Sequence, residues 1–354
     1  MPNVNKLLEW YDTNKRDLPW RRTSDPYKIW LSEIILQQTR VGQGLNYYHE
    51  FIRRFPTISH LAAADEDMVL KVWQGLGYYS RARNLHHAAK TVVNEYGGQF
   101  PESYDEIIKL KGVGPYTAAA VASIVFNEPR PVMDGNVMRV VSRWFAISEP
   151  VDSAKGREQI QIALDQLIDH ARPGLFNQAM MEFGATWCKP GKPDCANCVF
   201  KENCLAFRHR LVEELPRKKP KQKMRDRFFN YFFIRFGRGE QQFTLLKKRS
   251  GNDIWKGLYE FLLLETETEE TTEKLTAHPL LDKIRGNNQA VIRKISKTYI
   301  HQLTHQRIHA KFVDVEIQDG SLSLPEAYLE IPLSEIHNYP VSRLVNKFLQ
   351  ENLL

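Results

Sequence analysis

The four cysteines of this 354-residue chain all lie in one short stretch, at Cys188, Cys195, Cys198 and Cys204. Unrelated core cysteines would be expected to scatter along the chain, and two local disulfides would be expected mainly in an oxidising compartment. Four thiolates in one loop can instead enclose a zinc ion or an iron–sulfur cluster. Zinc sites usually show two closely spaced pairs, whereas here only the gap between Cys195 and Cys198 is that short. The spacing alone leaves both kinds of centre open.

The composition predicts a folded protein with a sizeable core, since hydrophobic residues make up 42% and charged residues 26% of the chain. We find no run of about 20 apolar residues and no apolar run near the N-terminus, so we expect neither a membrane span nor a secretory signal. We therefore expect a cytoplasmic protein. The net charge of +7 is modest, but it leaves a polyanionic partner open.

The residue composition and the hydrophobic periodicity of the chain change after Leu215. Residues 1–210 show helical periodicity with Gly and Pro corners, including a helix start at Asp25 and Pro26 and an amphipathic helix over 153–174 closed by Pro-Gly. Residues 211–227 are rich in basic residues and predict a linker. From 228 to 354, apolar runs rich in aromatic and β-branched residues predict strands, at 228–236, 242–249, 259–265 and 307–317. We therefore expect a mainly α N-terminal body followed by an α+β domain.

The loop Leu110–Pro115 joins two predicted helices and contains Lys111, Gly112, Val113 and Gly114. Glycine permits a left-handed backbone and a close approach to a ligand. The free amides at the start of the following helix point towards an anion. Taken alone, the loop could also be a helix–helix turn without a ligand.

Two carboxylates stand within apolar sequence. Asp134 precedes Gly135 and Asn136, where a side chain of this type often caps a helix. Glu33 stands among Trp30, Leu31, Ile34 and Ile35 in "WLSEIILQQTR". A solvated helix face is the ordinary explanation for such a glutamate. If Glu33 is buried instead, its pKa is raised and it can act as a general acid.

Together these features resemble the adenine DNA glycosylases of the MutY type, within the endonuclease III or helix-hairpin-helix superfamily. The resemblance covers nearly all of residues 1–210. It is carried in order by Leu18–Arg21, Ser32–Thr39, Gly75–Leu85, the loop at Leu110–Pro115, Met133–Val137 and the cysteines. The C-terminal region is similar, more weakly, to the Nudix-like domain with which this family recognises 8-oxoguanine. We find no Nudix hydrolase box around 257–270, which implies recognition there without pyrophosphate hydrolysis.

The resemblance implies a repair enzyme that flips out and excises adenine paired with 8-oxoguanine or G. It implies a 4Fe–4S cluster on the four cysteines, double-stranded DNA as the partner and a monomeric state. Glu33 would protonate the leaving adenine, and Asp134 would stabilise the cationic sugar, with Asn136 orienting water or Asp134. Related lyases place a lysine at Tyr116, and a phenol cannot form their Schiff base. We therefore predict a monofunctional glycosylase.

The resemblance also assigns DNA contacts. It places Gln38 and Tyr78 in the duplex beside the lesion, with Thr39 and Leu76 around them. The predicted DNA-contacting set is Arg21, Gln38, Thr39, Leu76, Tyr78, Lys111, Gly112, Val113 and Gly114. The lesion-contacting loop of the family is Phe-Ser-His, and this chain has Leu303, Thr304 and His305 in its place, departing from the pattern at the first two positions. Thr304 keeps a hydroxyl for 8-oxoguanine, whereas Leu303 keeps a wedge without aromatic stacking.

Two other functions fit part of the pattern. An endonuclease III-like glycosylase and lyase would share the loop and the cysteines, but Tyr116, Glu33 and the extra domain argue against it. A non-catalytic iron–sulfur DNA-binding protein or redox sensor would not need both Glu33 and Asp134.

Overall fold

The computed structural model describes residues 2–220, 224–238, 240–286, 288–318, 322 and 327–353. The chain forms two compact units. The first unit comprises Met1–Ala63 and Asn84–Lys221, and the second comprises Ala64–Arg83 and Gln222–Leu354. This division differs from the predicted domains in two respects: residues 64–83 pack with the C-terminal part of the chain, and the predicted linker 211–227 is divided between the two units.

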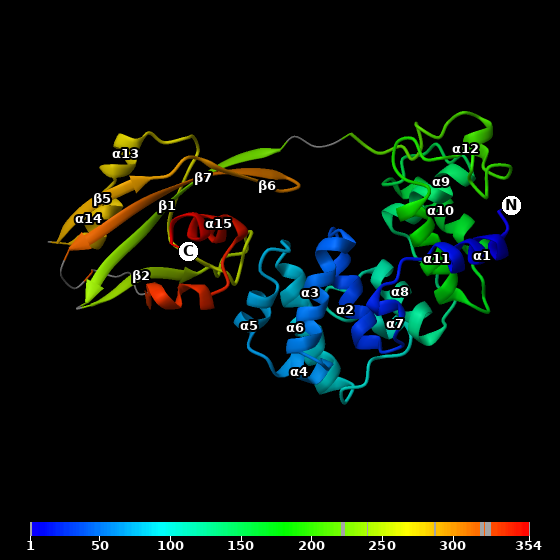
Figure 1. The fold of residues 1–354 in the computed structure, drawn as a ribbon, viewed down its shortest axis with the longest axis horizontal. Helices are drawn as coiled ribbons and strands as arrows, with labels where there is room; N and C mark the ends of the chain where they lie inside the picture. The colour runs from blue at the N-terminus through cyan, green and yellow to red at the C-terminus, as the bar shows by residue number, and fades with distance from the viewer. Residues whose placement is uncertain are drawn as a thin grey trace. The chain divides into compact units, whose positions relative to one another are not determined.

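The first unit is built from helices (Figure 1). They are α1 (Val4–Asn14), η1 (Pro19–Arg21), α2 (Pro26–Leu36), α3 (Val41–Arg54), α4 (Ile58–Ala63), most of α6 (Ser80–Glu95), α7 (Tyr104–Ile107), α8 (Pro115–Phe126), α9 (Gly135–Trp144), α10 (Ala154–Leu167), α11 (Pro173–Thr186) and α12 (Leu205–Arg208). The described chain contains no helix that combines the length and the apolar character needed to cross a bilayer.

Capping and proline signals in the sequence predicted the start of α2 correctly and the end of α10 incorrectly. Asp25 caps α2 by accepting hydrogen bonds from the backbone of Tyr27 and Lys28, and Pro26 is the first helical residue, as predicted. The helix predicted over 153–174 was wrong at its end. The α10 helix ends at Leu167, and Pro173 begins α11. Proline is favoured in the first turn because its missing N–H has no helical partner there, so Pro173 starts a helix instead of stopping one.

An aromatic cluster holds α1, α9 and α11 against the cysteine stretch. Phe183 of α11 contacts Trp10 with ring centroids 4.9 Å apart and Phe200 with centroids 5.2 Å apart. Trp144 of α9 packs on Phe200 at 4.6 Å. Because close-packed aromatic side chains resist displacement, the cluster fixes the two helices that carry much of the site described below.

The second unit contains a mixed sheet, which confirms the α+β prediction. Its described strands are β1 (Arg225–Arg238), β2 (Gln241–Lys248), β3 (Tyr259–Glu260), β4 (Leu262–Thr266), β5 (Gln289–Ile295), β6 (Tyr299–Gln302), β7 (Gln306–Gln318) and β8 (Leu329–Pro332). The main path runs β3-β2-β1-β7-β5. The central strands β1 and β7 pair in parallel, and the other pairs are antiparallel.

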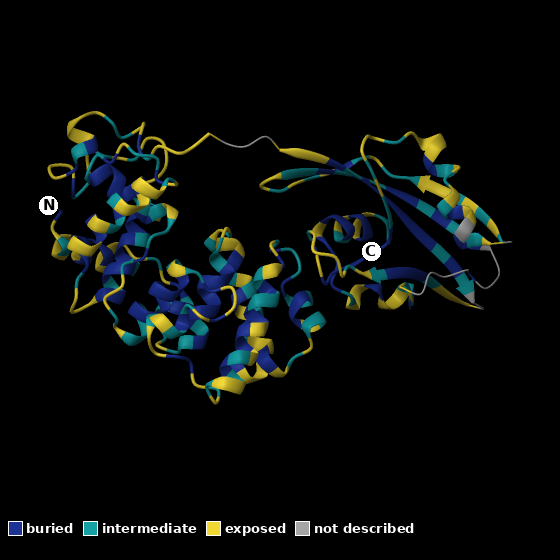
Figure 2. Ribbon diagram, turned by 180° about the vertical axis from the view of Figure 1, so that it is seen from behind, coloured by how far each residue is buried: buried dark blue, intermediate teal, exposed yellow. Residues whose placement is uncertain are grey.

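Helices cover both faces of this sheet, so its central strands are buried (Figure 2). On one face, Phe348 of α15 (Arg343–Asn352) stacks on Phe312 with centroids 4.1 Å apart and also contacts Phe233. On the other face, Phe232 packs with residues of α13 (Thr272–Thr276) and α14 (Pro279–Arg285). The remaining elements of the unit are α5 (Glu66–Val72) and η2 (Leu333–Asn338). Burial on both faces explains the mostly apolar stretch 228–236 of β1, which only Asn230 and Arg235 interrupt.

The predicted linker at 211–227 is folded at both ends. Leu215 is buried against the first unit, and the carbonyl of Arg217 accepts a hydrogen bond from the backbone of Val151. Strand β1 begins at Arg225, and the Arg227 side chain is paired with acidic groups of the second unit. The basic run was misleading because some of its charges are neutralised inside folded structure. The middle of the run, residues 221–223, lies outside the described residues.

Candidate active site

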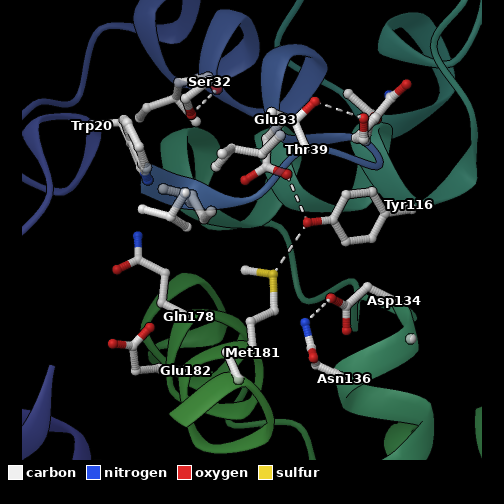
Figure 3. A pocket seen from close by; sticks show the side chains of 18 of the residues that line it. Trp20, Ser32, Glu33, Thr39, Tyr116, Asp134, Asn136, Gln178, Met181 and Glu182 are labelled. Atoms are coloured by element: carbon white, nitrogen blue, oxygen red, sulfur yellow. Dashed lines mark hydrogen bonds between the residues drawn. The ribbon is translucent and has the colours of Figure 1, made fainter. Parts of the chain in front are cut away.

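A cavity of about 990 Å³ opens in the first unit between α2, the loop before α8, the start of α9 and one face of α11 (Figure 3). It brings together the predicted acid and the predicted cation stabiliser, which are about a hundred residues apart in sequence. Its polar lining includes Arg16, Arg21, Glu33, Tyr116, Asp134, Asn136, Gln178 and Glu182. The cavity is large enough to admit a nucleobase.

Glu33 is buried on α2, and only 8% of the residue is exposed. Burial disfavours the charged carboxylate and raises the pKa of Glu33 to about 7. The hydrogen bond from Tyr116 and the charge of Arg21 lower this pKa, whereas the nearby Asp134 raises it. A substantial fraction of Glu33 therefore carries a proton at neutral pH.

Tyr116 stands in the first turn of α8 and connects two walls of the cavity. Its hydroxyl donates to Glu33 Oε2 at 2.7 Å and also lies 3.2 Å from Met181 Sδ of α11 (Figure 3). Burial and the two nearby carboxylates raise the pKa of Tyr116 well above its usual value. Tyr116 therefore stays a neutral phenol that directs Glu33, and it offers no amine to a sugar.

Asp134 is the N-cap of α9, as predicted. Its Oδ1 accepts a hydrogen bond of 2.7 Å from the backbone of Val137, and its Oδ2 accepts one of 2.8 Å from Asn136 Nδ2. Burial raises the pKa of Asp134, while these donors oppose the rise. The positive end of the helix dipole also favours a negative charge at this position. The cap thus fixes the carboxylate at the cavity wall.

Asn136 is held in place by Arg139. Arg139 Nη2 donates to Asn136 Oδ1 at 2.9 Å and to the carbonyl of Gly184 at 2.7 Å, and Arg139 Nε donates to the carbonyl of Cys188 at 2.8 Å. A side chain at Gly184 would lie 2.8 Å from Asn136 Cβ, so α9 and α11 meet closely there. The amide of Asn136 therefore presents its N–H₂ group to Asp134.

Glu182 is a second buried carboxylate in the cavity, and it is ion-paired. Its Oε2 accepts hydrogen bonds of 2.7 Å from both Arg16 and Arg21. Burial alone would raise its pKa, but these two guanidinium groups lower the pKa of Glu182 to about 2. Arg21 also donates to the carbonyl of Arg16 at 2.9 Å. Arg21, predicted to contact DNA, is thus engaged within the cavity wall.

The loop Leu110–Pro115 has the backbone of an anion cradle. Gly112 has φ +82°, and a side chain there would meet Asn84 of α6 at 2.5 Å, so this position requires glycine. Gly114 caps α8, and Pro115 is its first helical residue. Within the described part of the chain, the N–H groups of Gly112 and Gly114 donate no hydrogen bond. Lys111 beside them is exposed.

Other predicted DNA contacts divide between exposed and buried positions. Gln38 is exposed in the turn after α2 and has φ +58°, and Thr39 beside it also lines the cavity. Tyr78 belongs to the second unit, where half of it is exposed and its φ is +48°. Leu76 is only 8% exposed, so in this structure its side chain is largely covered.

The predicted lesion-contacting residues form the turn between β6 and β7. The backbone N–H of Leu303 donates to the carbonyl of Gln306 at 2.8 Å, and the carbonyl of His305 accepts from Arg225 at 3.1 Å. Thr304 and His305 are exposed, and Leu303 is half-buried. The Thr304 hydroxyl lies 2.6 Å from the hydroxyl of Tyr78. This turn thus joins the predicted lesion-contacting residues to Tyr78 in one place.

The cysteine stretch is tied to α9 by a buried arginine. Arg143 Nη1 lies 3.3 Å from Cys188 Sγ and donates to the carbonyl of Lys189 at 2.8 Å. The backbone of Phe200 donates to Cys198 Sγ at 3.4 Å. None of the four cysteines forms a disulfide. In the described residues, no group of three or more His, Cys, Asp or Glu side chains could hold a single metal ion.

Sequence reasoning missed the contribution of α11 to the cavity. Gln178, Met181 and Glu182 come from this helix, which shows no motif of its own. A buried glutamate at Glu182 is unusual enough to be a signal once burial is known, because such a charge needs a partner. The partners Arg16 and Arg21 lie far from it in sequence, so the ion pair was not predictable from spacing.

Comparisons with known proteins agree with this geometry. Residues 31–168 match the family model described as HhH-GPD superfamily base excision DNA repair protein, and residues 231–351 match a NUDIX domain. The solved structure of a thermostable thymine-DNA glycosylase superposes with a TM-score of 0.54 and 30% identity, covering 58% of this chain and 95% of that one. Fold and site thus define a helix-hairpin-helix base-excision protein.

The most similar curated proteins that we compared belong to one family within this class. The adenine DNA glycosylase of Arabidopsis thaliana is 36% identical over 366 residues, which span 90% of this chain and 58% of that protein. The adenine DNA glycosylase of Buchnera aphidicola subsp. Acyrthosiphon pisum is 36% identical over 264 residues, 74% of each chain. The chain belongs to the adenine DNA glycosylase family. It spans little more than half the length of the Arabidopsis relative.

Proposed function

We propose that this protein removes mispaired adenine from double-stranded DNA by hydrolysing the N-glycosidic bond. The observation that carries this proposal is the shared cavity of Glu33 and Asp134, in which Glu33 has a pKa of about 7 and Asp134 caps a helix N-terminus. Two carboxyl groups in different protonation states are what cleavage of a glycosidic bond requires. Names of the relatives supply the base, adenine.

Glu33 acts as the general acid. The base must leave the helical stack to enter the cavity. Adenine departs poorly as an anion, so protonation at N7 by Glu33 lets it depart as a neutral molecule. The hydrogen bond from Tyr116 fixes Glu33 Oε2, which leaves the other carboxyl oxygen to hold the transferable proton. A pKa near 7 allows this transfer at neutral pH.

Asp134 stabilises the cationic sugar that remains. Its oxygens accept hydrogen bonds from Val137 and Asn136, so the carboxylate does not have to reorganise as positive charge develops. Asn136 is a positioning residue, because Arg139 fixes its amide in turn. Water then adds to the sugar carbon and loses its proton to Asp134, which completes hydrolysis.

Tyr116 makes the enzyme monofunctional. A lyase needs an amine to form a Schiff base with the sugar, and a phenol held at Glu33 and Met181 offers none. Borohydride trapping with abasic and adenine-containing duplexes should give little covalent complex. Abundant trapped complex would favour the endonuclease III-like alternative.

The second unit selects adenines opposite 8-oxoguanine. The exposed turn Leu303–His305 presents the Thr304 hydroxyl as a hydrogen-bonding group, and Leu303 supplies an apolar wedge. The loop Leu110–Pro115 binds a DNA phosphate through the free N–H groups of Gly112 and Gly114, which positions the duplex without reading its sequence.

The cysteine loop fits a 4Fe–4S cluster held by Cys188, Cys195, Cys198 and Cys204. Arg143 and the backbone of Phe200 already direct N–H groups at two of the sulfurs, which suits thiolate ligands. A bound cluster supplies a crosslink of the loop. A colourless protein with stoichiometric zinc would contradict this assignment.

The test of the proposed function is single-turnover release of adenine from duplexes with A opposite 8-oxoguanine, G and T. We expect release opposite 8-oxoguanine and G, fastest opposite 8-oxoguanine, and little opposite T. Asp134→Asn should abolish release, and Asp165→Asn on the exposed face of α10 serves as the matched control. Unchanged release by Asp134→Asn would overturn the mechanism.

A further inference from the structure

Residues 64–83 are joined to the sheet of the second unit by specific contacts. On α5, Asp67 accepts a hydrogen bond of 2.9 Å from the hydroxyl of Tyr259 and forms an ion pair with Lys248. Tyr259 is buried in β3, and Lys248 ends the neighbouring strand β2. A single carboxylate on α5 therefore binds two adjacent strands.

Gln74 makes a second attachment at the end of this helix. Its Nε2 donates to Asn346 Oδ1 of α15 at 2.8 Å, and its Oε1 accepts from the backbone of Val341 at 3.3 Å. Tyr79 then donates to the carbonyl of Val341 at 3.4 Å. The segment before and after Gln74 is thus fixed by both side-chain and backbone groups.

Side chains of this segment also pack closely on Gly257. This residue has φ +82°, and a side chain there would lie 3.2 Å from Leu70 and 3.6 Å from Arg83. The Arg83 guanidinium donates to the carbonyl of Lys256. Since Trp255 packs on His301 of β6 at 5.6 Å, this contact continues into the hairpin that carries the turn Leu303–His305.

The segment presents Tyr78 to that same turn. Tyr78 has φ +48°, which is uncommon for an aromatic residue, and half of it is exposed. Its hydroxyl lies 2.6 Å from the Thr304 hydroxyl, and the Arg81 guanidinium covers its ring at 5.5 Å. The exposed Tyr78 is therefore held by Arg81 of its own segment and by Thr304 of the hairpin.

We propose that Asp67 is a positioning residue for recognition of the base opposite adenine. It holds α5 on β2 and β3, and thereby sets the place of Tyr78 against Thr304. The two exposed side chains then form one preset recognition surface, built from distant parts of the chain, and the Asp67 contacts determine its geometry. This inference rests on the proposed function, because it concerns the preference for 8-oxoguanine over G.

The experiment compares Asp67→Asn with Asp65→Asn. Both remove one negative charge from the same segment, but Asp65 is exposed and its side chain makes no capping hydrogen bond. Single-turnover rates and half-saturating enzyme concentrations are measured on duplexes with A opposite 8-oxoguanine and A opposite G. Thermal unfolding is recorded for both variants.

We expect Asp67→Asn to raise the half-saturating concentration for the 8-oxoguanine duplex about tenfold, the effect of losing one good charged hydrogen bond. The plateau rate and the affinity for the G duplex should change little, so the preference falls. Asp65→Asn should keep the preference. If Asp67→Asn keeps it as well, Asp67 does not position the recognition surface.

Tyr259→Phe provides a second variant that removes only the hydroxyl. It should lower the preference in the same direction, and its combination with Asp67→Asn should be less than additive because both changes break one contact. Full additivity would overturn the proposal. If the wild-type protein itself shows no preference for 8-oxoguanine, the proposed function fails instead, which separates the two outcomes.

Discussion

Two buried glutamates on opposite walls of one cavity have opposite ionisation behaviour. On the α2 wall, Glu33 receives a hydrogen bond from a phenol, and burial raises its pKa to about 7. On the α11 wall, Glu182 receives hydrogen bonds from Arg16 and Arg21, which lower its pKa to about 2. The partners decide which glutamate holds a transferable proton. A buried carboxylate is thus a catalytic acid or a structural anion according to its donors.

The largest effect is expected on the α2 wall. Glu33→Gln keeps the shape of the side chain and removes its acidic proton, so single-turnover adenine release should fall by about 10²- to 10⁴-fold. Glu9→Gln on the exposed side of α1 is the matched control. A loss of less than a few-fold would show that Glu33 is not the acid.

The same substitution on the α11 wall should affect stability more than chemistry. Glu182→Gln leaves the guanidinium groups of Arg16 and Arg21 without their shared anion. The free energy of unfolding at pH 7 should fall by about 3 kcal/mol, the usual cost of breaking a buried pair. Chemical denaturation measures this, with the exposed Glu158→Gln as control. Equal stability of the two variants would mean that the ion pair is not important for folding.

The two glutamates should also give opposite pH dependence of stability. The pKa of Glu33 is raised on folding, so its contribution is present below the unfolded pKa near 4.5 and is lost as pH rises to about 7. A rise of this size corresponds to about 3 kcal/mol. The free energy of unfolding of Glu33→Gln should therefore rise relative to that of wild type by about this amount as the pH increases from 5 to 8. A constant difference across that range would contradict the raised pKa.

For Glu182 the sign is reversed. Its pKa is lowered on folding, so its contribution is present above the unfolded pKa and is lost only as pH falls towards 2. Across pH 5 to 8, the stability difference between Glu182→Gln and wild type should stay constant. This flat profile is the matched control for the profile of Glu33→Gln.

The smallest effect is expected from the phenol itself. Tyr116→Phe removes the donor to Glu33 Oε2, which has been lowering the pKa of Glu33. Adenine release should slow about tenfold, the worth of one hydrogen bond to a reacting group. The alkaline limb of the pH–rate profile should move to higher pH. A limb at the wild-type position would show that Tyr116 does not control Glu33.

Local rules predicted the parts of this molecule that depend on neighbouring residues. The caps at Asp25 and Asp134 and the four predicted strand runs follow from short patterns of sequence, and the structure confirms them, whereas β5, β6 and β8 were not predicted. Glu33 was recognisable as a candidate from its apolar surroundings. Its pKa was not, because the Tyr116 hydroxyl and Asp134 reach it only through folding.

Contacts between residues that are far apart in the chain could not be predicted from the sequence. No sequence pattern near Glu182 indicates that Arg16 and Arg21 pair with it. A proline such as Pro173 is found both at helix starts and after helix ends, so its position alone did not place α11. The resemblance assigned residues 64–83 to the helical body. In the structure, Asp67 and Gln74 attach these residues to the second unit instead. Side-chain partners across long separations are set by packing, which no short pattern records.

The pH dependence of adenine release tests the central claim most directly. With enzyme in excess over a duplex carrying A opposite 8-oxoguanine, the release rate should fall about tenfold per pH unit above pH 7 as Glu33 loses its proton. This limb should be absent from the residual activity of Glu33→Gln and present in Glu182→Gln. A wild-type rate that stays constant between pH 6 and pH 9 would contradict the assignment of Glu33 as the acid.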